Sequence, residues 1–166
     1  MNLEKINNAN TEDIYRIFES CCCAPKWIEG MTNARPFSDP NALFKLSETC
    51  FSQLTEIDYL VAFEGHPQIG NLQTLQKKYA NTSGSASHEQ SGMSEAQKSV
   101  LEEMHKLNID YLEKFGFIFI VCASGKSAQE MLDLIKSRIN NDRQSELTIA
   151  GNEQAKITQI RLEKLL

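Results

Sequence analysis

The chain has 166 residues, of which 41% are hydrophobic, and a formal net charge of −5. This length suits one hydrophobic core, so we expect a single domain over residues 1–166. The acidic balance argues against a nucleic-acid partner, because a general nucleic-acid binder normally carries a basic face. No apolar run approaches the ~20 residues of a membrane span and none resembles a signal peptide, so we expect no membrane partner either.

Helix signals appear first in the N-terminal third of the chain. Asn10 is a typical capping residue for a helix that runs through Ile14 and Phe18. Asp39 followed by Pro40 combines a capping carboxylate with proline at the first helical position. After this pair, apolar residues recur at helical spacing, namely Leu43, Leu46, Cys50 and Leu54. The pattern predicts two helices in this region.

Three more helices are predicted in the second half. Ser94 and Gln97 can form a capping box for a long helix, whose apolar face carries Leu101, Met104, Leu107, Tyr111 and Phe115. A second amphipathic stretch carries Ala128, Met131, Leu132, Ile135 and Ile139. The last helix follows Asn141 and Asp142 and carries Leu147, Ala150, Ile157, Ile160 and Leu165.

Residues 117–121 (FIFIV) are the one segment with the composition of a β-strand. A single strand has no partner with which to form a sheet. We therefore interpret the segment as buried extended chain or as part of a helix, and predict an all-α fold.

His66 stands out because it precedes a proline in the motif GHPQIG at residues 65–70. Proline biases the residue before it toward an extended backbone, which would hold the imidazole stiffly. A rigid histidine is a candidate proton carrier, because its unperturbed pKa lies near neutrality. The alternative is a structural or helix-capping histidine in a turn, and the spacing alone leaves both interpretations open.

The cysteine and histidine patterns indicate neither disulfides nor a metal. Five cysteines, three of them adjacent at residues 21–23, make a poor disulfide framework, and no C-x-x-C pair is present. His66, His88 and His105 lack the spacing of metal ligands. We expect a reduced, cytoplasmic protein without a metal site. The sequence SGKS at residues 124–127 lacks the first glycine of a phosphate loop and is interpreted as a turn and helix start.

Residues 81–93 are rich in serine, glycine and alanine, which is typical of a flexible linker. His88, Glu89 and Gln90 lie inside this stretch. From composition alone, the stretch is interpreted as a solvated connection without a function.

A series of short motifs runs nearly end to end through the chain. It comprises CCCAPKW (21–27), RPF (35–37), GHPQIG (65–70), EQSG (89–92), KFGFIFIVCA (114–123), NDR (141–143), EL (146–147), KI (156–157) and IRL (160–162). In this order and spacing, the chain resembles the OHCU decarboxylase family. These enzymes convert 2-oxo-4-hydroxy-4-carboxy-5-ureidoimidazoline (OHCU) to (S)-allantoin at the end of urate oxidation. The resemblance implies an all-α homodimer that needs no cofactor.

The resemblance also assigns roles to individual residues. It implies His66 as the catalytic histidine, Glu89 as its partner carboxylate and Arg161 as the active-site arginine. The family usually has a serine three residues before the glutamate, where this chain has Ala86. We expect Ser87 to supply the hydroxyl instead. The substrate contacts implied in this way are Pro67, Ser87, Gln90, Phe119, Ile120, Val121, Cys122 and Ala123. The stretch that composition interprets as a linker then becomes part of the active site.

Two other functions remain compatible with the residues. A non-catalytic binding module for a purine-like or ureido ligand would need no proton carrier. An amidohydrolase acting on the ureido group would normally need a metal or an activated nucleophile. Replacing His66 and testing sensitivity to chelators and thiol reagents would discriminate among the three.

Overall fold

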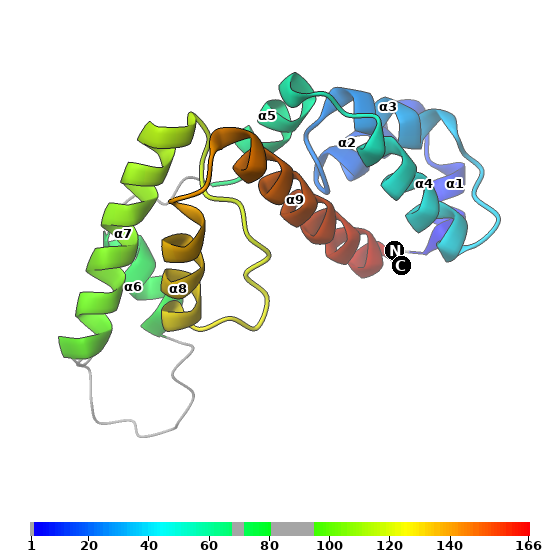
Figure 1. Cartoon of the computed structure of the whole chain (residues 1–166). Coiled ribbons are helices and arrows are strands. Elements are labelled where there is room, and N and C mark those ends of the chain that lie inside the picture. Colours follow the sequence, from blue (N-terminus) through cyan, green and yellow to red (C-terminus); the bar gives the residue numbers. More distant parts are fainter. Residues whose placement is uncertain (1, 68–71, 81–94) are drawn as a thin grey trace, which may run out of the picture. The chain divides into compact units, whose positions relative to one another are not determined.

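The computed structural model describes residues 2–67, 72–80 and 95–166, and within them all regular structure is α-helical (Figure 1). The described helices are α1 (Leu3–Asn8), α2 (Thr11–Glu19), α3 (Pro25–Asn33), α4 (Pro40–Ser52), α5 (Glu56–Glu64), α6 (Leu72–Ala80), α7 (Glu95–Phe115), α8 (Ala128–Arg138) and α9 (Arg143–Leu165). The predicted all-α fold is confirmed. None of these helices is long and apolar enough to cross a membrane.

The chain divides into two compact units. Unit 1 comprises Met1–His66, Ile120–Cys122 and Leu147–Leu166, and unit 2 comprises Pro67–Phe119 and Ala123–Glu146. Helix α9 begins in unit 2 and continues through unit 1. The expectation of one domain over residues 1–166 stays a prediction.

In unit 1, the two predicted helix starts are capped by the side chains expected from the sequence. The Asn10 side chain accepts a hydrogen bond from the Asp13 amide at 2.8 Å, and the Asp39 side chain accepts one from the Ala42 amide at 2.9 Å. Each satisfies an N–H group that the first helical turn leaves without a partner. Helix α4 ends at Ser52, so Leu54 lies beyond the helix to which its spacing assigned it.

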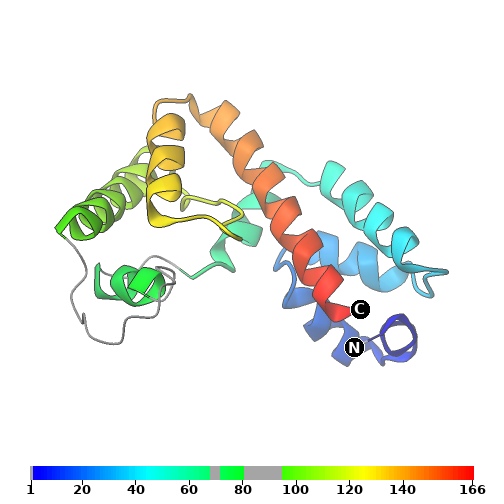
Figure 2. The same cartoon turned by 90° about the horizontal axis from the view of Figure 1, so that it is seen from below.

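The core of unit 1 forms around a fully buried tryptophan. Helix α2 packs on α3 and α3 on α4, as Figure 2 shows from below. The Trp27 and Phe18 rings pack edge to face, with 5.8 Å between their centroids. The Trp27 indole N–H donates a hydrogen bond to Ser47 Oγ at 3.1 Å. The buried indole therefore has both its apolar contacts and its hydrogen-bond partner. Arg35 lies at the edge of this core and donates to the backbone oxygens of Ile6 and Ala9.

In unit 2, α7 packs against α6 and α8. Ser127 and Glu130 form a reciprocal capping box at the start of α8, which confirms that residues 124–127 are a turn and helix start. Residues 117–121 form neither helix nor strand, which fits the extended interpretation. The predicted capping residue Ser94 lies outside the described residues.

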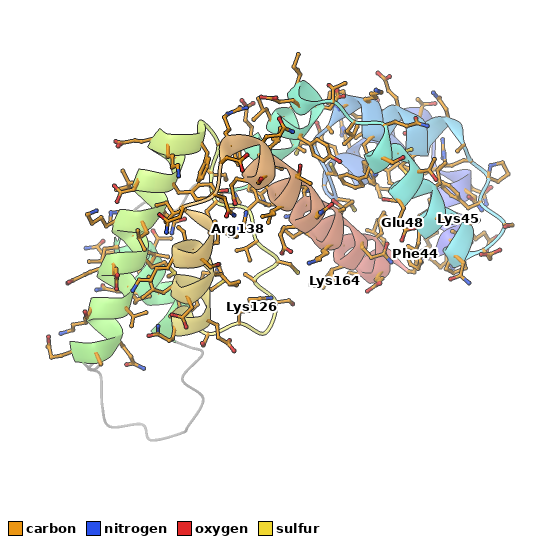
Figure 3. The ribbon with its side chains drawn as sticks, viewed as in Figure 1. Phe44, Lys45, Glu48, Lys126, Arg138 and Lys164 are labelled. Atoms are coloured by element: carbon orange, nitrogen blue, oxygen red, sulfur yellow. The ribbon has the colours of Figure 1, made fainter. Side chains whose placement is uncertain are left out.

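Unit 2 contains a buried ionic cluster around Glu146. Its carboxylate accepts hydrogen bonds from the Tyr111 hydroxyl at 2.5 Å, from Arg138 Nε at 2.6 Å and from Asn141 Nδ2 at 3.0 Å. Arg138 is the last residue of α8 (Figure 3), and its guanidinium lies 4.5 Å from the centre of the Phe119 ring. The cluster therefore holds Phe119 against α7 and α8 within unit 2.

Candidate active site

His66 lies in the turn that follows α5. Gly65 caps the helix, and the His66 amide donates to the Phe63 carbonyl at 3.1 Å. A Cβ atom at Gly65 would lie 2.3 Å from Cys23 Sγ, so a side chain there would force Cys23 or the turn to shift. Glycine therefore allows the end of α5 to approach Cys23, and this approach positions the half-buried His66.

One face of α9 contacts both His66 and the chain at Cys21. His66 Nε2 lies 2.6 Å from Gln154 Oε1, and Gln154 Nε2 lies 3.3 Å from Thr158 Oγ1. One turn further, Arg161 Nη1 donates to the Cys21 carbonyl at 2.9 Å. Residues 154, 158 and 161 have the i, i+4, i+7 spacing of one helix face. Unit 1 thus brings together His66 and Arg161, two of the three predicted catalytic residues.

The environment of His66 favours its neutral form. Burial lowers its pKa from the ordinary 6.5, the hydrogen bond to the Gln154 side-chain oxygen opposes the shift, and the positive charge of Arg161 lowers the pKa further. The imidazole is therefore mainly uncharged at pH 7. A neutral imidazole has one nitrogen that accepts a proton and one that donates, which is what a proton carrier requires.

The segment that follows Phe119 also reaches α9. The Cys122 amide donates to the Glu153 carboxylate at 2.8 Å, and Ile120 is buried. Unit 1 thus places Ile120, Val121 and Cys122 against the helix that bonds to His66. The other predicted substrate contacts with described positions, namely Pro67, Phe119 and Ala123, belong to unit 2.

Three predicted site residues, Ser87, Glu89 and Gln90, lie outside the described residues, and their roles stay predictions. Among the residues that the structure does describe, no group of three His, Cys, Asp or Glu side chains could hold a metal ion.

The cysteines next to the site behave as small buried groups. Burial raises the pKa of Cys22 to about 11 and also raises the pKa values of Cys21 and Cys23. These thiols are therefore protonated at neutral pH, which makes them poor nucleophiles. All five cysteines are thiols in this structure.

The sequence reasoning missed Gln154 and Thr158. They occupy the same stripe of α9 as Ala150 and Leu162, at steps of four residues, and all four side chains are buried. Two polar residues in an apolar stripe are a signal that the sequence contains. Interpreting it requires knowing that His66, 88 residues earlier, lies opposite Gln154.

Comparisons with known proteins agree with this fold. Residues 7–163 match the family model for OHCU decarboxylase. The chain is 36% identical over 154 residues to the uric acid degradation bifunctional protein TTL of Arabidopsis thaliana, covering 93% of this chain and 47% of that protein. It is 24% identical over 174 residues to the 2-oxo-4-hydroxy-4-carboxy-5-ureidoimidazoline decarboxylase of Amia calva, covering all of this chain and 95% of that protein.

Among solved structures, an OHCU decarboxylase crystallised in the presence of (S)-allantoin superposes with a TM-score of 0.72 at 33% identity, covering 95% of this chain and 98% of that one. This all-α chain belongs to the OHCU decarboxylase family. It spans about half the length of the Arabidopsis relative and about a third of the length of two bifunctional relatives from Bacillus.

Proposed function

We propose that this chain catalyses the decarboxylation of OHCU to (S)-allantoin in urate degradation. Two findings support the proposal: the chain matches the family over residues 7–163, and it holds the half-buried His66 against the α9 face that carries Arg161. The observation that carries it is the half-buried imidazole of His66, bonded to Gln154 at 2.6 Å. A solvated histidine in a turn would not need a fully buried partner.

The reaction can proceed with the substrate ring as its own electron sink. When CO₂ leaves C4, the electrons of the broken bond form a C4=C5 double bond, and the electrons of the C5=N bond move to nitrogen, which takes a proton from water. The C4 hydroxyl then loses its proton to give the C4=O of allantoin, and C5 gains one. The protein supplies orientation and proton transfer, which are the typical contributions of positioned side chains.

We assign the proton transfer to His66 and substrate binding to Arg161. The guanidinium has five N–H donors in a planar fork, and one of its nitrogens donates to Cys21. The remaining donors suit the carboxylate of OHCU. Glu89 would orient His66 or the ureido N–H groups. The predicted contacts of Ser87, Gln90, Pro67 and residues 119–123 would hold the donor–acceptor edges of the ring.

We also propose that the protein is a homodimer in the cytoplasm and needs neither metal nor organic cofactor. The dimer and the lack of a cofactor rest on the family resemblance. Five cysteines present as thiols are typical of a reducing compartment and support the cytoplasmic assignment.

The proposed activity can be tested by generating OHCU in place from urate with urate oxidase and hydroxyisourate hydrolase. The intermediate also decays spontaneously without a preferred face, and that route gives racemic allantoin. The protein should hasten its loss and give (S)-allantoin, seen as a growing circular-dichroism signal. Faster decay with a racemic product would indicate only nonspecific acid–base catalysis. No acceleration would favour the binding module.

Variants of the assigned residues test their roles in the same assay. His66→Asn should lower turnover by about 10² or more, since a positioned acid–base group typically contributes 10²–10⁴-fold. His105→Asn, on α7 in unit 2, is the matched control and should leave turnover unchanged. Glu89→Gln and Arg161→Ala should lower activity strongly with little change in melting temperature. Near-normal turnover by folded His66→Asn would remove His66 from the mechanism.

A further inference from the structure

Gln154 is a buried polar side chain that contacts the imidazole of His66. Its exposed fraction is 0%, so both ends of its amide need partners within the protein. The oxygen lies 2.6 Å from His66 Nε2 and the nitrogen lies 3.3 Å from Thr158 Oγ1. Gln154 thus links His66 to Thr158, which is also fully buried.

The Thr158 hydroxyl determines which way this amide faces. Oγ1 lies 2.9 Å from the Gln154 backbone oxygen and 3.5 Å from the Cys21 backbone oxygen. A hydroxyl carries a single proton, and both of these neighbours can only accept it. Toward the Gln154 side chain, Oγ1 therefore acts as an acceptor, so the NH₂ group faces Thr158. The amide oxygen must then face His66.

We propose that Gln154 and Thr158 are positioning residues that hold the proton of neutral His66 on Nε2 and leave Nδ1 as the nitrogen that reacts with substrate. An amide oxygen can only accept, so it bonds to the neutral ring only when Nε2 carries the proton. In serine proteases too, a hydrogen bond to one ring nitrogen of the catalytic histidine fixes the tautomer, and the other ring nitrogen takes part in the reaction.

This assignment rests on the proposed function and specifies its proton path. The O–H bond of the C4 hydroxyl breaks as the Nδ1–H bond forms. The Nδ1–H bond then breaks as the C5–H bond forms, and CO₂ has already left. His66 returns to its starting state, with Nε2 bonded to Gln154 throughout the cycle.

Nitrogen NMR on histidine-labelled protein tests the tautomer without any substrate. The chain has three histidines, so a His66→Asn spectrum assigns the His66 signals. At pH 8 the wild-type protein should show a protonated, pyrrole-type Nε2 and an unprotonated, pyridine-type Nδ1. Thr158→Val removes the hydroxyl that orients the amide and should add a population with the proton on Nδ1. Thr158→Ser keeps the hydroxyl and should give the wild-type spectrum. A pyridine-type Nε2 in the wild-type protein overturns the proposal.

Kinetics test whether this positioning matters for turnover. Gln154→Leu keeps a similar volume but removes the acceptor, and should lower kcat about tenfold with little change in KM. This loss is smaller than the 10²–10⁴-fold contribution of a general acid–base itself. Gln159→Leu makes the same change on α9 at a half-buried position and should leave kcat unchanged. Thr158→Val should lower kcat and Thr158→Ser should not. Unchanged kcat in both Gln154→Leu and Thr158→Val would refute the positioning role.

The two readouts separate this inference from the proposed function. If the wild-type protein fails to decarboxylate OHCU, the proposed function is wrong whatever the NMR spectrum shows. If the protein is active but its Nε2 is unprotonated, the function holds and the positioning role is refuted.

Discussion

Replacing Glu146 with glutamine should destabilise the protein strongly. The Glu146 side chain is fully buried, and Arg138, which bonds to it through Nε at 2.6 Å, is only 6% exposed. Glutamine keeps the volume but removes the charge, so the buried guanidinium loses its ion pair with Glu146. Breaking a buried pair in this way typically costs about 3–5 kcal/mol. For a chain of this size, each kcal/mol lowers Tm by roughly 2–4 °C, so we expect a loss of about 6–20 °C.

Thermal and urea unfolding followed by circular dichroism measure this loss. Glu163→Gln makes the same change at an exposed position on α9 and should stay within about 0.5 kcal/mol of wild type. The double variant Arg138→Met/Glu146→Leu removes both charges together and should lose less stability than the two single changes added together. A loss below about 1 kcal/mol for Glu146→Gln would show that the pair contributes little and would refute the reasoning.

Three further predictions concern the region around His66. Because burial and the charge of Arg161 lower the His66 pKa, the NMR titration midpoint of His66 should lie below 6.5. Arg161→Gln should raise this midpoint. A wild-type midpoint above 6.5 would contradict the buried environment of His66. Because the His66 pKa is lowered on folding, the unfolded chain binds this proton more readily than the folded protein. The free energy of unfolding should therefore fall as pH drops below about 6.5. Urea titration at pH 5 and pH 8 should show a smaller fall in His66→Asn than in the wild-type protein. Gly65→Ala should lower stability by about 1–3 kcal/mol through its clash with Cys23, and normal stability would show that the turn can move.

The helix starts could be predicted because their causes are local. A capping side chain bonds to an amide two or three residues away, so Asn10 and Asp39 carry the signal within one turn of chain. The capping box of Ser127 and Glu130 is equally local. Where a signal depended on spacing alone, as for Leu54, the helix ended before the last apolar residue.

The arrangement around His66 could not be predicted from local signals. Its contact with Gln154 joins residues 88 positions apart, and Thr158 lies 137 positions from Cys21. Such pairs follow from how α9 packs in unit 1, which no single segment specifies. The assignment of Arg161 came from resemblance rather than from charge pattern, because an isolated arginine on a helix is usually a solvated side chain.

The regular geometry of helix α9 fixes the spacing and the relative direction of the site residues that it carries. Successive residues rise about 1.5 Å and turn about 100°, so Gln154 and Arg161 are held about 10 Å apart along its axis and on the same side. Substitutions on the exposed side of the helix do not change the relative placement of Gln154 and Arg161. One inserted or deleted residue between positions 154 and 161 would turn Arg161 by about 100° around the helix axis and away from the face of Gln154. Evolution can therefore vary the composition of this stretch of α9 far more easily than its length.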